Sequence, residues 1–205
     1  MMNEKTLLQR AIEFAAAKHA GQNRKGTTIP YMTHVIEAME IVCRMTEDEE
    51  LRAAAVLHDT LEDTETTREE LVVAFRERVA GLVAAESEDK RKGEPEEKTW
   101  LERKRETIKH LREADTEIRM LALGDKLSNM RAMARDYKVK HEELWQRFNE
   151  KDPVMQGKYY CGLVNAFRLD KTIRKTPAFE EYADLCAEVF HVERDQDGKM
   201  IVEEL

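Results

Sequence analysis

The sequence predicts an all-α fold, and three observations lead to this prediction. Ala, Leu, Glu, Lys and Arg dominate the chain, and these residues have high helix propensity. The sequence contains only 8 glycines and 4 prolines, which argues against an all-β fold rich in turns. Apolar side chains also recur at helical spacing, first over residues 4–20, where Gly21 follows as a helix terminator.

Further helices are expected in the segments that keep this apolar spacing. A helix over 48–59 has a candidate capping box in Thr46 and Glu49, and Thr67 with Glu70 repeats the signal for 68–76. Residues 88–98 contain no large apolar side chain and are expected to form an exposed loop. The other helices are expected over 33–45, 77–87, 99–112, 115–135, 139–150, 154–172 and 177–190.

The length of the chain favours one domain. A chain of 205 residues can build a hydrophobic core of its own. The last residues instead alternate like strands around Asp197-Gly198, which is a hairpin signal. We therefore expect a helical domain over residues 1–190 and a C-terminal tail over 191–205 that can form a short β-hairpin.

The charge and the cysteines disfavour several classes of function. The net charge is −8, so general binding to nucleic acid or to an anionic membrane is not expected. Cys43, Cys161 and Cys186 are widely spaced and form no CxxC motif, which indicates reduced thiols in a cytoplasmic protein. We expect no signal peptide and no membrane-spanning segment, because no apolar run is long enough.

Residues 53–64 (AAAVLHDTLEDT) are the most informative stretch of the sequence. An apolar helical segment leads into His58 and Asp59, and Glu62 and Asp63 follow one turn later. If the helix persists, residues four apart share a face, so Glu62 lies beside His58 and Asp63 beside Asp59. Burying so much negative charge is costly unless a cation offsets it, and a divalent metal is the simplest such cation.

A second polar pair lies within the apolar segment at 121–130 (LALGDKLSNM). Asp125 and Asn129 are four residues apart and share one helix face, so they require a partner or a ligand. His34, near the start of another helix, adds a second imidazole. Two imidazoles and two carboxylates would suit Mn²⁺, Fe²⁺ or Zn²⁺, although the sequence alone does not bring these helices together.

Four stretches together resemble a known family. Residues 53–64 resemble the central motif of the HD phosphohydrolase superfamily. With 14–25 (FAAAKHAGQNRK), 30–34 (PYMTH) and 124–130 (GDKLSNM), the likeness sharpens to the hydrolase domain of RelA/SpoT enzymes and covers about residues 5–170. Because the chain ends at Leu205, without room for synthetase and regulatory domains, it resembles the stand-alone small alarmone hydrolases related to the metazoan SpoT homologue.

The resemblance implies a set of roles for individual residues. It implies a bound divalent metal, usually Mn²⁺, and a catalytic acidic pair. It also implies that one side chain lies against the purine, beside a basic neighbour, and that another reaches the ribose. These roles fall on His34, His58, Asp59 and Asp125 for the metal, Glu62 and Asp63 for catalysis, Arg24 and Lys25 for the base, and Asn129 for the ribose.

The implied reaction is hydrolysis of the 3′-pyrophosphate of (p)ppGpp to GDP or GTP and pyrophosphate. Two alternatives remain open: an HD phosphohydrolase of another nucleotide, such as an adenosine alarmone or a nucleoside monophosphate, and a catalytically silent nucleotide-binding module. Both imply a small nucleotide as the partner. The silent module is disfavoured, because the ligands and the acidic pair are all present.

Other residues receive weaker assignments. Lys90, Arg103 and Lys104 are hypothesised to hold substrate phosphates, with a solvated helix face as the equal alternative. Gly124 stands where the family usually has alanine, which reads as one small residue in place of another. Tyr159 and Tyr160 are expected in the core, and structural or surface positions are expected for His19, His110, His141 and His191.

Overall fold

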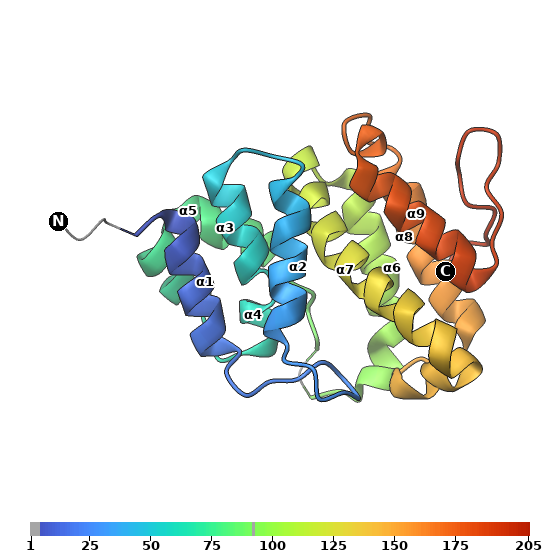
Figure 1. The fold of residues 1–205 in the computed structure, drawn as a ribbon, viewed down its shortest axis with the longest axis horizontal. Helices are drawn as coiled ribbons and strands as arrows, with labels where there is room; N and C mark the ends of the chain where they lie inside the picture. The colour runs from blue at the N-terminus through green and yellow to red at the C-terminus, as the bar shows by residue number, and fades with distance from the viewer. Residues whose placement is uncertain (1–4, 92) are drawn as a thin grey trace. The chain divides into compact units, whose positions relative to one another are not determined.

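The predicted all-α fold is confirmed. The computed structural model describes residues 5–91 and 93–205, and in these ranges β-structure is limited to isolated bridges. The elements, drawn in Figure 1, are α1 (Leu7–Lys18), α2 (Met32–Cys43), α3 (Glu49–Leu57), α4 (Thr60–Asp63), α5 (Arg68–Glu86), α6 (Glu96–Glu113), α7 (Thr116–Lys140), the 3₁₀ helix η1 (His141–Arg147), α8 (Pro153–Phe167), the 3₁₀ helix η2 (Ile173–Lys175) and α9 (Pro177–Phe190).

The described residues form two compact units: residues 5–87 with 120–128, and residues 88–91 and 93–119 with 129–205. In the first unit, α3 packs against α1, α2 and α5. Figure 1 shows α3 with α1 on one side and α2 on the other. Residues 53–57 of α3 are all buried, and three of them are alanines, which let the neighbouring helices approach closely.

Helix α3 is shorter than expected and ends at Leu57. His58 and Asp59 form a turn, and the short α4 begins at Thr60, whose hydroxyl donates to the Leu57 carbonyl at 2.7 Å. The main-chain N–H of Asp63 still donates to the Asp59 carbonyl at 2.8 Å. The spacing of one turn between Asp59 and Asp63 is therefore kept across the break.

The two predicted capping boxes have different outcomes. Thr67 is the N-cap of α5 and accepts from the Glu70 N–H at 3.2 Å, as expected. The cap of α3 is Asp48 rather than Thr46: its carboxylate accepts from the Leu51 N–H at 2.9 Å. A carboxylate beside the first-turn N–H groups also interacts favourably with the helix dipole. The predicted division of 68–87 into two helices appears as a kink at Arg76, where φ is 74°.

In the second unit, α8 packs against α6 and α9. Helices α6 and α8 approach closely at Gly162, where an added Cβ would lie 2.8 Å from Ile108 Cδ1. The expected loop over 88–98 is shorter, because α6 begins at Glu96, and the Glu88 side chain is only 15% exposed. Residues 141–147 form a 3₁₀ helix rather than an α-helix.

The tail folds back on itself around Asp195, whose N–H donates to the Lys199 carbonyl at 2.9 Å. Gly198 takes a φ of +78°, a conformation that L side chains rarely adopt. The expected hairpin consists of a single antiparallel bridge between Arg194 and Met200. The expected domain boundary at residue 190 stays a prediction.

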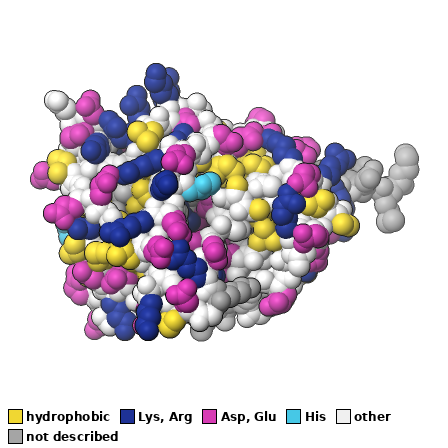
Figure 2. Space-filling model, turned by 180° about the vertical axis from the view of Figure 1, so that it is seen from behind, with side chains coloured by type: hydrophobic (Ala, Val, Ile, Leu, Met, Phe, Trp, Pro, Cys, Tyr) yellow, Lys and Arg dark blue, Asp and Glu magenta, His cyan; other side chains and the backbone are white. Residues whose placement is uncertain are grey.

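The surface drawn in Figure 2 carries Lys and Arg side chains interspersed with Asp and Glu. No helix in the described ranges is both long enough and apolar enough to cross a bilayer. The three cysteines are free thiols, and Cys161 and Cys186 are buried.

Candidate metal centre and active site

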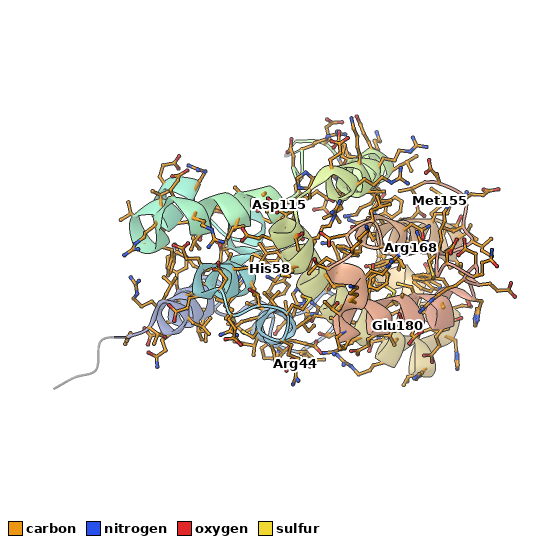
Figure 3. The ribbon with its side chains drawn as sticks, turned by 90° about the horizontal axis from the view of Figure 1, so that it is seen from above. Arg44, His58, Asp115, Met155, Arg168 and Glu180 are labelled. Carbon is orange, nitrogen blue, oxygen red and sulfur yellow. The ribbon has the colours of Figure 1, made fainter. Side chains whose placement is uncertain are left out.

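The turn after α3 presents the first two donors. His58, labelled in Figure 3, is 2% exposed, and its Nδ1 lies 2.8 Å from the Ala55 carbonyl, so Nδ1 carries the proton. This Nε2 lies 2.9 Å from Oδ2 of Asp59. The end of the buried helix α3 therefore fixes the His58 side chain by packing and by a main-chain hydrogen bond.

His34, in the first turn of α2, completes the cluster. Its Nε2 lies 3.3 Å from His58 Nε2, 3.4 Å from Asp59 Oδ2 and 3.1 Å from Asp125 Oδ1. The donor atoms of His34, His58 and Asp59 all lie within 4.8 Å of one another. Two imidazole nitrogens that face each other at this distance share at most one proton, so the arrangement suits a cation between them. Nitrogen and oxygen donors of this kind fit Mn²⁺, Fe²⁺ or Zn²⁺.

The charges of the cluster depend on one another. Burial alone would lower the pKa of His58, but the carboxylates of Asp59 and Asp125 raise it well above the ordinary value. Burial would raise the pKa of Asp59, yet His58 and His34 hold it well below its usual range. Burial would likewise raise the pKa of Asp125, but Lys126 and the two histidines hold it well below its usual range. Both carboxylates thus carry negative charge in a buried place, which is the electrostatic condition for binding a metal cation.

A hydrogen-bonded chain behind His34 fixes its tautomer. The Ser128 hydroxyl donates to Glu37 Oε2 at 2.8 Å, so it accepts from His34 Nδ1–H at 2.9 Å. The lone pair of His34 is therefore on Nε2, which points into the cluster. Sequence reasoning missed Ser128 and Glu37. Their only sequence signal is position, because Ser128 lies inside the 124–130 motif and Glu37 lies one turn after His34.

Tyr31 is a second residue without an expected role. Its hydroxyl lies 2.6 Å from Asp59 Oδ2 and 2.9 Å from Asp63 Oδ2, so one proton is shared between two carboxylates. Burial, together with Asp59 and Asp63, raises the pKa of Tyr31, so the phenol stays protonated and donates. The Tyr31 ring also packs edge-on against His34, with ring centroids 5.6 Å apart.

Asp125 also has a cationic partner outside the metal cluster. Lys126 Nζ contacts the Asp125 carboxylate and lies 3.4 Å from Glu86 Oε1. Burial raises the pKa of Glu86 from 4.5 to about 7, although Lys126 acts in the opposite direction. Sequence reasoning did not identify Lys126 or Glu86, because nothing near Glu86 in the sequence marks it as close to the Asp125 motif.

The acidic pair and the basic loop also belong to the first unit. Glu62 and Asp63 lie in α4 and are half-buried. The loop after α1 is closed by the Arg24 N–H, which donates to the Ile29 carbonyl at 2.8 Å, and Gln22 Nε2 donates to the Asp63 carbonyl at 2.9 Å. Arg24 is half-buried and Lys25 is exposed.

The residues proposed for phosphate binding lie in the second unit. Arg103 is buried, and its guanidinium contacts the Glu88 carboxylate, which also accepts from Lys104 Nζ at 2.8 Å. Lys104 Nζ lies 5.0 Å from the centroid of the Tyr159 ring. Lys90 and Asn129 are half-buried. The role of these residues in binding phosphate or ribose stays a prediction.

The other histidines and tyrosines considered in the sequence analysis lie either at the surface or inside the protein. His110, His141 and His191 are exposed, whereas His19 is buried and its Nδ1 lies 2.8 Å from Gln22 Oε1. Tyr159 is buried and Tyr160 is half-buried.

Several of the curated proteins that this chain resembles are named as guanosine-3′,5′-bis(diphosphate) 3′-pyrophosphohydrolases. The chain is 37% identical over 134 residues to the Danio rerio protein named guanosine-3′,5′-bis(diphosphate) 3′-pyrophosphohydrolase MESH1, covering 63% of this chain and 70% of that protein. It is 36% identical over 140 residues to the Homo sapiens protein of the same name, covering 66% of this chain and 74% of that protein. An Aquifex aeolicus guanosine-3′,5′-bis(diphosphate) 3′-pyrophosphohydrolase is 40% identical over 127 residues, covering 62% of this chain and only 18% of that protein.

Two solved structures share the fold. One is described as a metazoan ortholog of SpoT that hydrolyzes ppGpp and plays a role in starvation responses; its TM-score is 0.70 at 25% identity, covering 92% of this chain and 97% of that one. The other is lmo0812 from Listeria monocytogenes, with a TM-score of 0.67 at 32% identity, covering 79% of this chain and 96% of that one. The predicted likeness to small alarmone hydrolases is confirmed.

The HD-domain sequence profile matches residues 11–154, a span that includes His34, the His58-Asp59 doublet and Asp125. This match covers more than half of the sequence, and the chain therefore belongs to the HD-domain family.

Proposed function

We propose that this chain is a metal-dependent hydrolase that removes the 3′-pyrophosphate of guanosine-3′,5′-bis(diphosphate). The observation that carries the proposal is the buried cluster of His34, His58 and Asp59, whose donor atoms lie within 4.8 Å of one another. It is supported by membership of the HD-domain family and by the names of the relatives.

His34, His58, Asp59 and Asp125 would hold the cation, and Mn²⁺ is our choice among the metals that this donor set fits. When bound, a divalent cation supplies Lewis acidity next to the reacting phosphorus. The ion can be identified by metal analysis of protein purified without chelator. Titration calorimetry with Mn²⁺, Fe²⁺ and Zn²⁺ then ranks their affinities.

Glu62 and Asp63 are proposed to move the protons. Hydrolysis forms a bond from a water oxygen to the phosphorus and breaks the bond between that phosphorus and the ribose 3′ oxygen. The water proton passes to one carboxyl of the pair, and the 3′ oxygen receives a proton from the other, giving GDP and pyrophosphate. Tyr31 supports this role, since its hydroxyl ties Asp63 to Asp59 and orients the Asp63 carboxylate.

Substrate binding is proposed for two groups of residues. The Arg24 guanidinium would stack on the base, with Lys25 beside it, because a planar cation can cover a purine face. Asn129 would reach the ribose, and Lys90, Arg103 and Lys104 would contact phosphates.

A pair of variants tests the phosphate role. Lys104→Ala removes the cation that forms an ion pair with Glu88, and Glu88→Gln weakens that ion pair while keeping the lysine. A KM that rises in Lys104→Ala but not in Glu88→Gln supports phosphate binding by Lys104. An unchanged KM in both variants, with lowered thermal stability, would mean that this ion pair stabilises the fold and does not bind phosphate.

The domain boundary and the compartment are also proposals. We propose that residues 1–190 form the catalytic domain, which limited proteolysis within 191–205 tests through retained activity. A cytoplasmic location accords with the three free thiols. Cell fractionation would test it.

The decisive experiment measures pyrophosphate release from ppGpp by the purified chain, with Mn²⁺ and with chelator. Asp59→Ala should abolish release, whereas Asp136→Asn, which weakens an ion pair with Arg147, should leave it unchanged. Release by the wild type only in the presence of metal, with GDP as co-product, supports the proposal. Turnover of another nucleotide instead would keep the hydrolase and change its substrate, and tight binding without turnover would indicate a silent module.

A further inference from the structure

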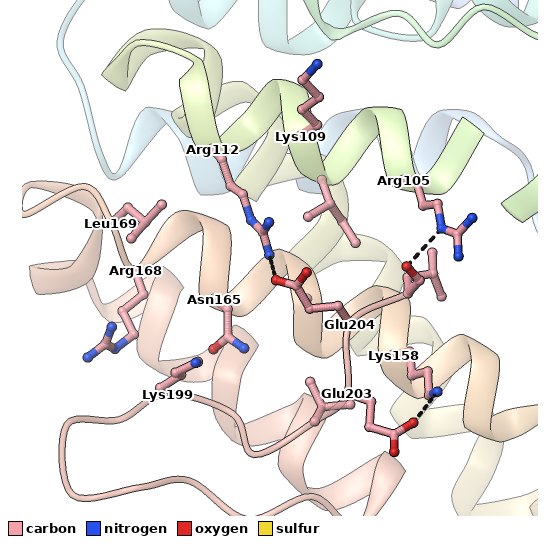
Figure 4. A pocket seen from close by; sticks show the side chains of 14 residues that line it. Arg105, Lys109, Arg112, Lys158, Asn165, Arg168, Leu169, Lys199, Glu203 and Glu204 are labelled. Atoms are coloured by element: carbon pink, nitrogen blue, oxygen red, sulfur yellow. Dashed lines mark hydrogen bonds and ion pairs between the residues drawn. The ribbon is translucent and has the colours of Figure 1, made fainter. Parts of the chain in front are cut away.

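A basic cavity of about 460 Å³ lies in the second unit and is lined by α6, α8 and the tail (Figure 4). Its described lining contains none of the candidate site residues. The lining holds the carboxylates of Glu203 and Glu204 together with a larger number of cations. The cations are Arg105, Lys109, Arg112, Lys158, Arg168 and Lys199. In a chain with a net charge of −8, this local excess of positive charge points to an anionic ligand.

The tail already places acceptor oxygens among these cations. Glu204 pairs with Arg112 at 2.7 Å, and Glu203 pairs with Lys158 at 2.7 Å. Arg105 Nε donates to the Leu205 carbonyl at 2.9 Å, as Figure 4 shows. These contacts show that cations of α6 and α8 can each engage an acceptor oxygen of the tail.

Two hydrogen bonds hold the tail upstream of these ion pairs. The Asn165 side chain accepts from the Met200 N–H at 2.9 Å and donates to the Met200 carbonyl at 3.1 Å. In contrast, the Glu203 and Glu204 side chains are 85% and 81% exposed, so their ion pairs contribute little to stability. A ligand can therefore displace the Glu203 and Glu204 side chains while the rest of the tail stays in place.

The chemistry of the lining selects the class of anion. Three arginines offer planar pairs of donors, which match the geometry of phosphate oxygens. The described lining contains no aromatic side chain on which a base could stack. Recognition would therefore depend on phosphoryl groups rather than on a nucleoside.

We infer that this cavity binds a small polyphosphate anion, with which Glu203 and Glu204 compete for Arg112 and Lys158. Such an anion carries more negative charge than the two carboxylates and can engage cations that the tail leaves unneutralised. Lys199 is one of them, because it lines the cavity and makes no ion pair within the described part of the chain. The inference does not depend on the proposed hydrolase activity.

Titration calorimetry of inorganic tripolyphosphate into the full chain tests this site. The titration is done in chelator, so that divalent metal cannot take part. The wild type should bind saturably, and Arg112→Gln should weaken binding by about tenfold or more. Arg44→Gln is the matched control, because Arg44 is 78% exposed and pairs with Glu40 in α2. Circular dichroism verifies that the variants keep their fold.

A second variant tests the competition with the tail. Glu203→Gln with Glu204→Gln removes both carboxylates without shortening the chain and should tighten binding severalfold. Equal weakening by Arg44→Gln and by the cavity variant would show diffuse charge attraction and overturn the site. Absence of saturable binding in both the wild type and the tail variant would overturn it as well. An unchanged affinity in the tail variant would refute the competition.

Discussion

The Tyr31 hydroxyl lies 2.6 Å from Oδ2 of Asp59, a carboxylate of the candidate metal cluster. The same hydroxyl lies 2.9 Å from Asp63, so one phenol joins the metal cluster to the acidic pair. We predict that Tyr31→Phe keeps the fold but lowers kcat by roughly tenfold to a hundredfold, as is usual for groups that orient metal ligands. Steady-state kinetics and a Mn²⁺ titration measure the effect.

Tyr137→Phe is the matched control for this change. Its hydroxyl also donates to a carboxylate, Glu142 at 3.1 Å, but that pair is exposed. Activity and metal affinity should be unchanged. Equal kcat values for the wild type and Tyr31→Phe would mean that the link between Asp59 and Asp63 is not needed for turnover.

Ser128→Ala should weaken metal binding by roughly tenfold to a hundredfold. The change removes the acceptor of His34 Nδ1–H and the donor to Glu37, so the imidazole can turn or change tautomer. Calorimetry with Mn²⁺ gives the affinity directly. Ser87→Ala serves as the control, since that hydroxyl donates only to the Val83 carbonyl at the end of α5. Wild-type affinity in Ser128→Ala would contradict a positioning role.

Gly124→Ala should destabilise the chain by about 1–3 kcal/mol. An added Cβ would lie 2.7 Å from Val42 Cγ2 and 2.9 Å from the Ala38 carbonyl oxygen, and the main chain of α2 cannot yield as a flexible side chain can. Gly81→Ala, in α5, meets nothing within 4 Å and should instead stabilise by about 0.5–1 kcal/mol. Urea denaturation compares the two, and equal effects would refute this steric explanation.

Glu86 should give stability a distinctive pH dependence. Its pKa is raised from 4.5 to about 7 in the folded chain, so the folded state binds a proton that the unfolded state has lost between these values. Stability from this group therefore falls as the pH rises through that window, by at most roughly 3 kcal/mol.

The test is the free energy of unfolding in chelator for wild type and Glu86→Gln at pH 5 and pH 8. The difference between the two proteins should favour the wild type more at pH 5 than at pH 8. A constant difference would show that Glu86 keeps an ordinary pKa.

Much of the fold was predictable because the relevant forces are local. Helical periodicity identified most helices, and α9 has the predicted bounds of 177–190. The kink at Arg76 also falls where two helices were expected. The cap of α3 was predicted wrongly, since Thr46 and Asp48 are both good caps and only the path of the chain chooses between them.

The sequence by itself determined the all-α class and the kind of chemistry, because periodicity and the spacing of His58, Asp59 and Asp63 act within one or two turns. Only the tertiary structure decided which partners surround them. Tyr31 and Ser128 contact the cluster from distant parts of the chain, and Glu86 contacts Lys126, which pairs with Asp125. The tertiary structure also explains the glycine at position 124. Helix α2 approaches so closely there that even an alanine side chain would not fit without a shift. Such contacts depend on how helices pack, which local sequence does not encode.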